Sequence, residues 1–196
     1  MSLKPDRSES FKPAPDGLHT AICINVIDLG MQTTAWGNKR QVILSFELSS
    51  VLMDSGKPYV VSKTFTNSLH EKGSLRAILE PWIGSKELDN PDFSLGELAG
   101  RVVMVTIVHR TTPKGVFADL VAAARIPKEM MKDSAALKPH NPLIVYDQDN
   151  SPVETLDGLP TWIRNKALGA PVFVEHTADK GPGNFTETDR FDDIPW

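Results

Sequence analysis

Aromatic and cationic side chains stand together in the stretch from Gly30 to Arg40, where Trp36 is followed by Lys39 and Arg40. An exposed tryptophan beside two cations is uncommon without a binding role. Its ring can stack on an unpaired base, and the cations can neutralise the adjoining phosphates. We therefore expect Trp36, Lys39 and Arg40 to contact single-stranded DNA.

A second set lies between Pro58 and Thr66, where Tyr59, Lys63 and Phe65 share one face of a predicted strand. Two aromatic rings with a cation between them could form a stacking surface for DNA bases. In the alternative interpretation the rings belong to the core, and Lys63 extends its ammonium group past them to solvent. The sequence leaves both interpretations open.

Patterns typical of catalysis or metal binding are not found. The sequence has no glycine-rich phosphate-binding turn, and its five histidines are scattered without metal-ligand spacing. Asp147 and Asp149 fall in a predicted turn, where solvation explains them. The lone Cys23 lies in an apolar strand pattern, so neither a disulfide nor a cysteine zinc cluster is expected. Active sites also assemble from distant residues, but we expect no enzyme activity, no cofactor and no metal.

The segment from His176 to Trp196 joins acidic charge to a terminal apolar group. It holds five acids against Lys180 and Arg190, a composition that cannot bury enough apolar surface to order itself. At its end, proline restricts the chain, isoleucine and tryptophan could fill a pocket, and aspartates could meet a basic rim. We predict a disordered tail whose partner-binding tip is Phe191, Asp192, Asp193, Ile194, Pro195 and Trp196.

The ending DDIPW is similar to the acidic tips of bacterial and bacteriophage single-stranded DNA-binding proteins. Those tails commonly close on aspartates followed by Ile-Pro and an aromatic residue, usually Phe, where this sequence has Trp196. The resemblance implies a protein that coats single-stranded DNA and recruits replication or recombination proteins through its tip. It also implies a place in the cytoplasm of a bacterial host.

The formal net charge is −4, and the acidic tail supplies most of it. The body is therefore not basic, whereas strong phosphate binders usually are. A DNA site must be a local groove of Lys and Arg with strong salt sensitivity. The sequence shows neither a secretion signal nor an apolar run long enough to span a membrane. We therefore expect that the protein is neither secreted nor inserted in a membrane.

Five segments have the alternation or the β-branched content of strands. They are residues 18–29, 40–52, 58–66, 101–110 and 116–126. Between the third and fourth, an apolar stripe predicts a helix that starts near Asn67 or Ser68 and ends at Gly84. Arg76 lies off this stripe and is a further candidate for DNA contact. Residues 30–40 and 111–115 are predicted loops.

This order of elements is that of the OB-fold, a five-stranded Greek-key barrel with a helix between strands 3 and 4. A small β-sandwich with an intervening helix is the alternative. OB-fold ligands lie across strands 2 and 3, between the loops that join strands 1 to 2 and strands 4 to 5. Trp36 falls in the first loop and Lys114 in the second, so Lys114 joins the predicted DNA-binding residues.

We divide the chain into a flexible leader (1–16), an OB-fold core (17–126), a C-terminal extension that packs on the core (127–175) and the disordered acidic tail (176–196). In the extension, 143–146 is a short apolar run and 159–166 a helical turn, in which Trp162 and Ile163 seal the domain or a subunit contact. The expected function is non-catalytic binding of single-stranded DNA. The alternative is an adaptor or structural β-barrel protein of a phage assembly that binds protein instead. A homo-oligomer is compatible with both.

Overall fold

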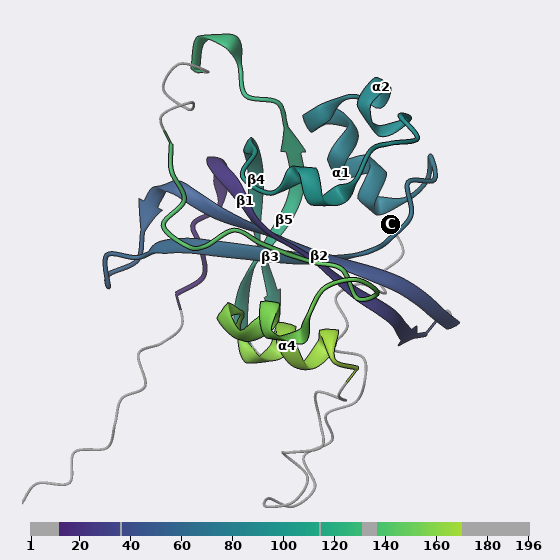
Figure 1. Ribbon diagram of the computed structural model, residues 1–196. Helices are drawn as coiled ribbons and strands as arrows, with labels where there is room; N and C mark the ends of the chain where they lie inside the picture. Colours follow the sequence, from purple (N-terminus) through teal and green to yellow (C-terminus); the bar gives the residue numbers. More distant parts are fainter. Residues whose placement is uncertain (1–11, 36, 114, 131–136, 170–196) are drawn as a thin grey trace, which may run out of the picture.

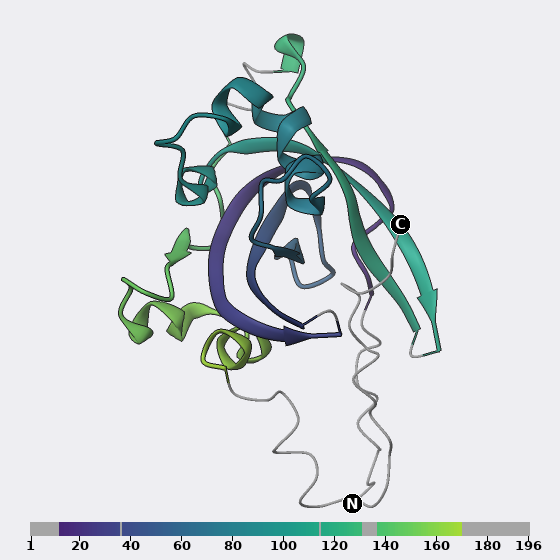
Figure 2. The same cartoon turned by 90° about the vertical axis from the view of Figure 1, so that its right-hand side faces the viewer.

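The computed structural model describes residues 12–35, 37–113, 115–130 and 137–169. Its central feature is a curved antiparallel sheet with the strand order β3-β2-β1-β4-β5. The strands are β1 (Gly17–Thr34), β2 (Gly37–Leu52), β3 (Pro58–Thr66), β4 (Val102–Thr112) and β5 (Gly115–Ala124). Figure 1 shows the long β1–β2 ribbon crossing β4 and β5, and Figure 2 shows β1 and β2 bending in an arc. The prediction of a mainly β chain is confirmed.

A helix between β3 and β4 is confirmed: α1 (Ser74–Ile83) ends at the predicted Gly84. A second helix that was not predicted, α2 (Ser85–Leu88), and the 3-10 turn η1 (Leu95–Leu98) follow it. The predicted start near Asn67 is wrong, because the chain first makes a tight turn in which the Gly73 amide donates to the His70 carbonyl at 2.7 Å. A side chain at Gly73 would lie 2.9 Å from that carbonyl oxygen, so glycine is required at this turn.

The concave face of the sheet carries the main hydrophobic core. Alternate residues of the strands meet the apolar stripe of α1, and the ring of Phe46 packs edge-on against Trp82 with centroids 5.9 Å apart. The apolar stripe predicted for the helix is confirmed, since Leu75, Leu79 and Trp82 are buried. We call this set the concave-face core.

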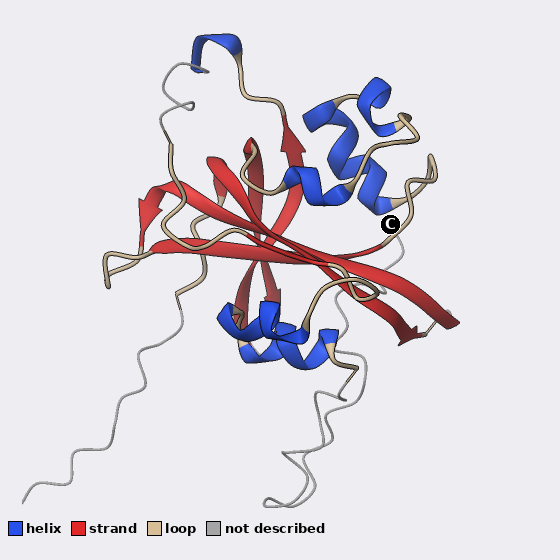
Figure 3. Cartoon of the chain, viewed as in Figure 1, coloured by secondary structure: helices blue, strands red, loops and turns tan. Residues whose placement is uncertain are grey.

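The convex face of β1 and β2 is covered by the chain that follows β5. This segment contains η2 (Lys128–Met130), β6 (Ile144–Tyr146), η3 (Val153–Gly158) and α4 (Thr161–Ala167). β6 pairs in parallel with β1 at Asn25, Val26 and Ile27, just beyond the point where β4 leaves β1. Figure 3 shows the result, with α1 and α4 on opposite sides of the sheet.

A second cluster fills the space under this cover, and we call it the convex-face core. Its members are Ile27, Leu29, Ile43, Ile144, Tyr146, Leu156, Leu159, Ile163 and Ala167. Ile163 is thus sealed inside the domain, whereas the Trp162 side chain is exposed. Because both faces of β1 and β2 are buried, these strands carry apolar residues on both faces.

The predicted loop at 30–40 is wrong. β1 continues to Thr34 and β2 begins at Gly37, so the stretch forms a hairpin arm that extends beyond the rest of the sheet. Glycine at 37 has φ +95°, which suits the tight connection. The sequence did not predict this arm, because its residues are mostly polar on both faces. It therefore lacks the apolar alternation that marks a half-buried strand.

Candidate nucleic-acid interface

The β1–β2 hairpin arm presents the first set of predicted DNA contacts. Lys39 lies opposite Gln32 in the β1–β2 ladder and is half-buried. The Gln32 amide nitrogen donates to the carbonyl of Leu29 at 2.7 Å and to that of Lys166, at the end of α4, at 3.1 Å. The arm is therefore anchored to the C-terminal cover. Trp36, at its tip, lies outside the described residues.

Arg40 is already engaged at the base of the arm. Its guanidinium donates through Nε and Nη2 to both carboxylate oxygens of Asp28, and through Nη2 to Asp149 at 2.6 Å. Asp147 lies 3.8 Å from the same nitrogen. The hydrogen bonds that Arg40 donates to Asp28, and then those to Asp149, raise the pKa of Arg40. A phosphate would have to displace these carboxylates to reach it.

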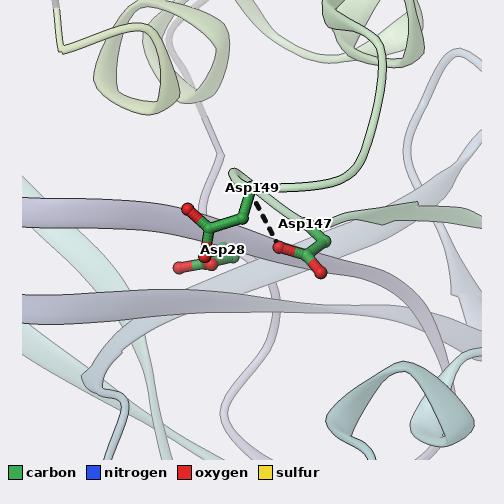
Figure 4. A group of neighbouring side chains, drawn as sticks. All are labelled: Asp28, Asp147 and Asp149. Atoms are coloured by element: carbon green, nitrogen blue, oxygen red, sulfur yellow. Dashed lines mark hydrogen bonds between the residues drawn. The ribbon is translucent and has the colours of Figure 1, made fainter.

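The carboxylates of three aspartates, Asp28, Asp147 and Asp149, lie close together beside Arg40 (Figure 4). One oxygen from each lies within 4.8 Å of the others, a spacing that a metal ion could bridge. In this structure the positive charge among them is supplied by Arg40. The pKa of Asp147 is lowered mainly by the hydrogen bond from the Asn150 amide, then by the Asp149 backbone N–H. These contacts account for the group as a brace between β1, β2 and the turn after β6.

The second set, on β3, points to the concave side. Phe65 is 2% exposed and belongs to the concave-face core, so its ring offers no open face to a base. Tyr59 is half-buried and packs against the same core. The Lys63 ammonium donates to Asp119 at 3.1 Å and to the Leu120 carbonyl at 2.7 Å, both on β5. The core interpretation therefore describes the placement of Phe65, while Lys63 bridges two strands instead of reaching solvent.

Of the two other predicted cations, Arg76 is paired with carboxylates and Lys114 is not described. Arg76 on α1 donates to Asp89 at 2.7 Å and to Glu80 at 3.2 Å. Lys114 and the tip residues Phe191 to Trp196 lie outside the described residues. All six arginines in the described part of the chain are bonded to carboxylates or, for Arg125, to the carbonyls of Trp82 and Ile83.

Unpaired positive charge on the described surface is therefore carried by lysines. Six ammonium groups have no ion pair among the described residues: Lys39, Lys57, Lys72, Lys86, Lys128 and Lys138. The lysine ammonium binds phosphate as a point charge on a flexible stem, so the contact does not require the fixed geometry of an arginine. A backbone-tracking contact that does not read sequence suits this pattern.

The sequence did not single out the convex face of β3, which is partly exposed. Val60 is 43% exposed there, and Ser62, Thr64 and Thr66 follow on the same face. Ser62 shares a hydrogen bond of 2.8 Å with Ser45 on β2. Beyond Ser45 the convex face disappears beneath the C-terminal cover. The signal was present in the alternation of 58–66, but the pattern alone does not say which face is buried.

Comparison with known protein families and with curated proteins finds no match to this sequence. Among the described residues, no helix is long and apolar enough to cross a membrane.

Proposed function

We propose that this protein binds single-stranded DNA without catalysing a reaction, through an OB-fold barrel, and recruits replication or recombination proteins through its acidic C-terminal tip. The observation that carries the proposal is the strand order β3-β2-β1-β4-β5 with a helix between β3 and β4. Bringing the end strands β3 and β5 together would give the OB-fold barrel. The Lys63 bridge from β3 to β5 supports that closure.

The binding residues that we propose are the predicted ones to which the contacts above assign no structural role. Trp36 and Lys39 belong to the β1–β2 hairpin, and Lys114 to the connection between β4 and β5. These are the two connections that flank the ligand in OB-folds. Tyr59, half-buried on β3, is the remaining aromatic candidate. We assign Arg40, Lys63, Phe65 and Arg76 to holding the fold rather than to DNA contact.

A titration tests the proposal directly. Intrinsic tryptophan fluorescence is followed while oligo-dT or a duplex of equal length is added at two salt concentrations. We expect quenching by oligo-dT that weakens as salt rises, and weaker binding of the duplex. Trp36→Ala should lose about 1–3 kcal/mol of binding free energy. Trp162→Ala, which removes an exposed tryptophan on α4, is the matched control.

Two results would overturn the proposal. Absence of oligo-dT binding at low salt would remove DNA from the function altogether. Equal affinity for duplex and single strand would remove the stacking mechanism. The second candidate, an adaptor or structural protein of a phage assembly, would then be favoured, because the engagement of all described arginines suits a protein that does not bind phosphate.

The tail is tested separately, by deleting Asp192 to Trp196. We expect equal or tighter binding of oligo-dT, since an acidic arm competes with DNA for cations. Binding to a replication or recombination protein should be lost in the same variant. Retention of that binding would show that the tip is not the recruiting segment.

A further inference from the structure

A pocket of about 370 Å³ opens where the two ends of the sheet approach each other. Its walls come from β3, from the beginning of α1 and from β5. The apolar lining is Phe65, Ala77, Ile78 and Val121. This volume lies in the range of about 300–1,000 Å³ that is usual for small-molecule sites.

The pocket exists because β3 and β5 end the sheet without forming a ladder with each other. Where a ladder would bring two backbones about 4.8 Å apart, this seam is spanned by the long side chain of Lys63, which reaches Asp119 and the Leu120 carbonyl. The bulge in β5 near Leu120 leaves Val121 at the pocket, 37% exposed. Space remains between Val121 and the first turns of α1.

The mouth of the pocket carries a surplus of positive charge. Lys72 is exposed and forms no ion pair with any described residue. Asp119 accepts from both Lys63 and Arg110, at 3.1 and 2.7 Å, and the charged residues that line the pocket itself are Lys63, Lys72 and Glu71. A ligand suited to this site has a flat or apolar body and a negative group beside it.

We propose that this seam pocket holds one nucleotide of a bound single strand, with the base against Ile78 and Val121 and a backbone phosphate near Lys72. The inference rests on the proposed function and extends it, because it places a nucleotide outside the hairpin arms. The bound DNA would then pass from the β1–β2 hairpin arm and the β4–β5 connection over the seam between β3 and β5.

Ala77→Phe is the variant that fills the pocket. Ala77 is an exposed residue of α1 that lines the opening, so a larger side chain can be accommodated without entering the core. Ser85→Phe, at the exposed start of α2, adds the same ring outside the pocket and is the control. Both variants should melt at the wild-type temperature. Exclusion of the nucleotide from the pocket should weaken binding of a long oligo-dT in Ala77→Phe, with no change in Ser85→Phe.

Lys72→Gln tests the charge independently of the pocket volume. The slope of log affinity against log salt should fall by about 0.7, the value for one phosphate contact on a single strand. Lys86→Gln, also exposed and unpaired, should leave the slope unchanged.

The outcomes separate this inference from the function on which it rests. If the wild-type protein binds no oligo-dT, the proposed function fails and this site with it. If the wild type binds oligo-dT and both Ala77→Phe and Lys72→Gln bind it unchanged, the pocket is not a nucleotide site, although the function stands. Loss of a protein partner in Ala77→Phe, with DNA binding intact, would likewise overturn the inference and assign the pocket to that partner.

Discussion

The ammonium nitrogen of Lys63 lies 3.1 Å from Oδ1 of Asp119, and this ion pair joins the two strands that end the sheet. Both side chains are largely shielded, at 17% and 21% exposure. An ion pair of this kind differs from one in open solvent, since removing one partner leaves the other without its full set of bonds in a poorly hydrated place. The link between β3 and β5 should therefore matter to the stability of the whole sheet.

Lys63→Met tests this link. The substitution keeps the apolar stem but removes the donor to Asp119 and to the Leu120 carbonyl, so we expect the free energy of unfolding to fall by about 1–3 kcal/mol. Urea denaturation measures it. Lys12→Met removes the exposed partner of Asp54 and should cost less than about 1 kcal/mol. Equal small losses in both variants would show that the seam is not held by Lys63.

Glu47→Gln tests how the C-terminal cover is attached. Glu47 is 3% exposed on β2, and its carboxylate accepts from the backbone N–H groups of His140 and Asn141 and from the Asn141 amide, at 2.7, 2.8 and 2.7 Å. A glutamine would turn an NH₂ group toward some of these donors, so we expect about 1–3 kcal/mol of destabilisation. Amide hydrogen exchange should accelerate at His140 and Asn141. The exposed Glu154→Gln, on η3, should change neither, and slow exchange in Glu47→Gln would contradict the attachment.

Arg40 and Lys39 are neighbours with different expected roles, and salt dependence separates them. Lys39→Gln should lower the slope of log affinity for oligo-dT against log salt by about 0.7, because it removes one phosphate contact. Arg40→Gln should leave that slope unchanged, because Arg40 bonds to Asp28 and Asp149. It should nevertheless loosen the hairpin arm, which protease cleavage within residues 30–40 would report. A reduced slope in Arg40→Gln would restore it as a phosphate contact.

Burial raises the pKa of the Cys23 thiol from its ordinary 9.0 to about 12. The folded thiol thus stays neutral at pH values where the unfolded thiol ionises, which favours the unfolded state as pH rises. The stability linked to this group is complete below pH 9 and declines between pH 9 and 12. We expect no reaction of native Cys23 with a thiol reagent at pH 8 and full reaction in urea. Rapid native labelling would contradict the burial.

Several elements followed from local sequence because local physics determines them. The strand 58–66 was predicted at its observed bounds, since a turn at Asp54–Lys57 precedes an alternating β-branched run. The site was less predictable. Arg40 pairs with Asp149, 109 residues away, and no local pattern marks such a pairing. Similarly, the alternation of β3 identified two faces but could not show that Lys63 faces β5.

The apolar residues of β1 and β2 also indicate that the sheet is covered on both sides. Ile27 and Ile43 lie on the face opposite the concave-face core, and apolar residues on both faces indicate a strand that is covered twice. That pattern would have predicted a partner for the convex face, which β6, η3 and α4 supply.

β1 has two neighbours in succession along one edge, β4 up to Ile22 and β6 from Asn25 onward. The second neighbour comes from more than a hundred residues later in the chain, so during synthesis the first half of the molecule must wait, with Ile27, Leu29 and Ile43 unprotected, until α4 has emerged. A polypeptide that ends at residue 126 would leave the apolar convex face of β1 and β2 exposed permanently and should self-associate. We therefore expect the segment after β5 to prevent association of copies of this protein through the convex face of β1 and β2.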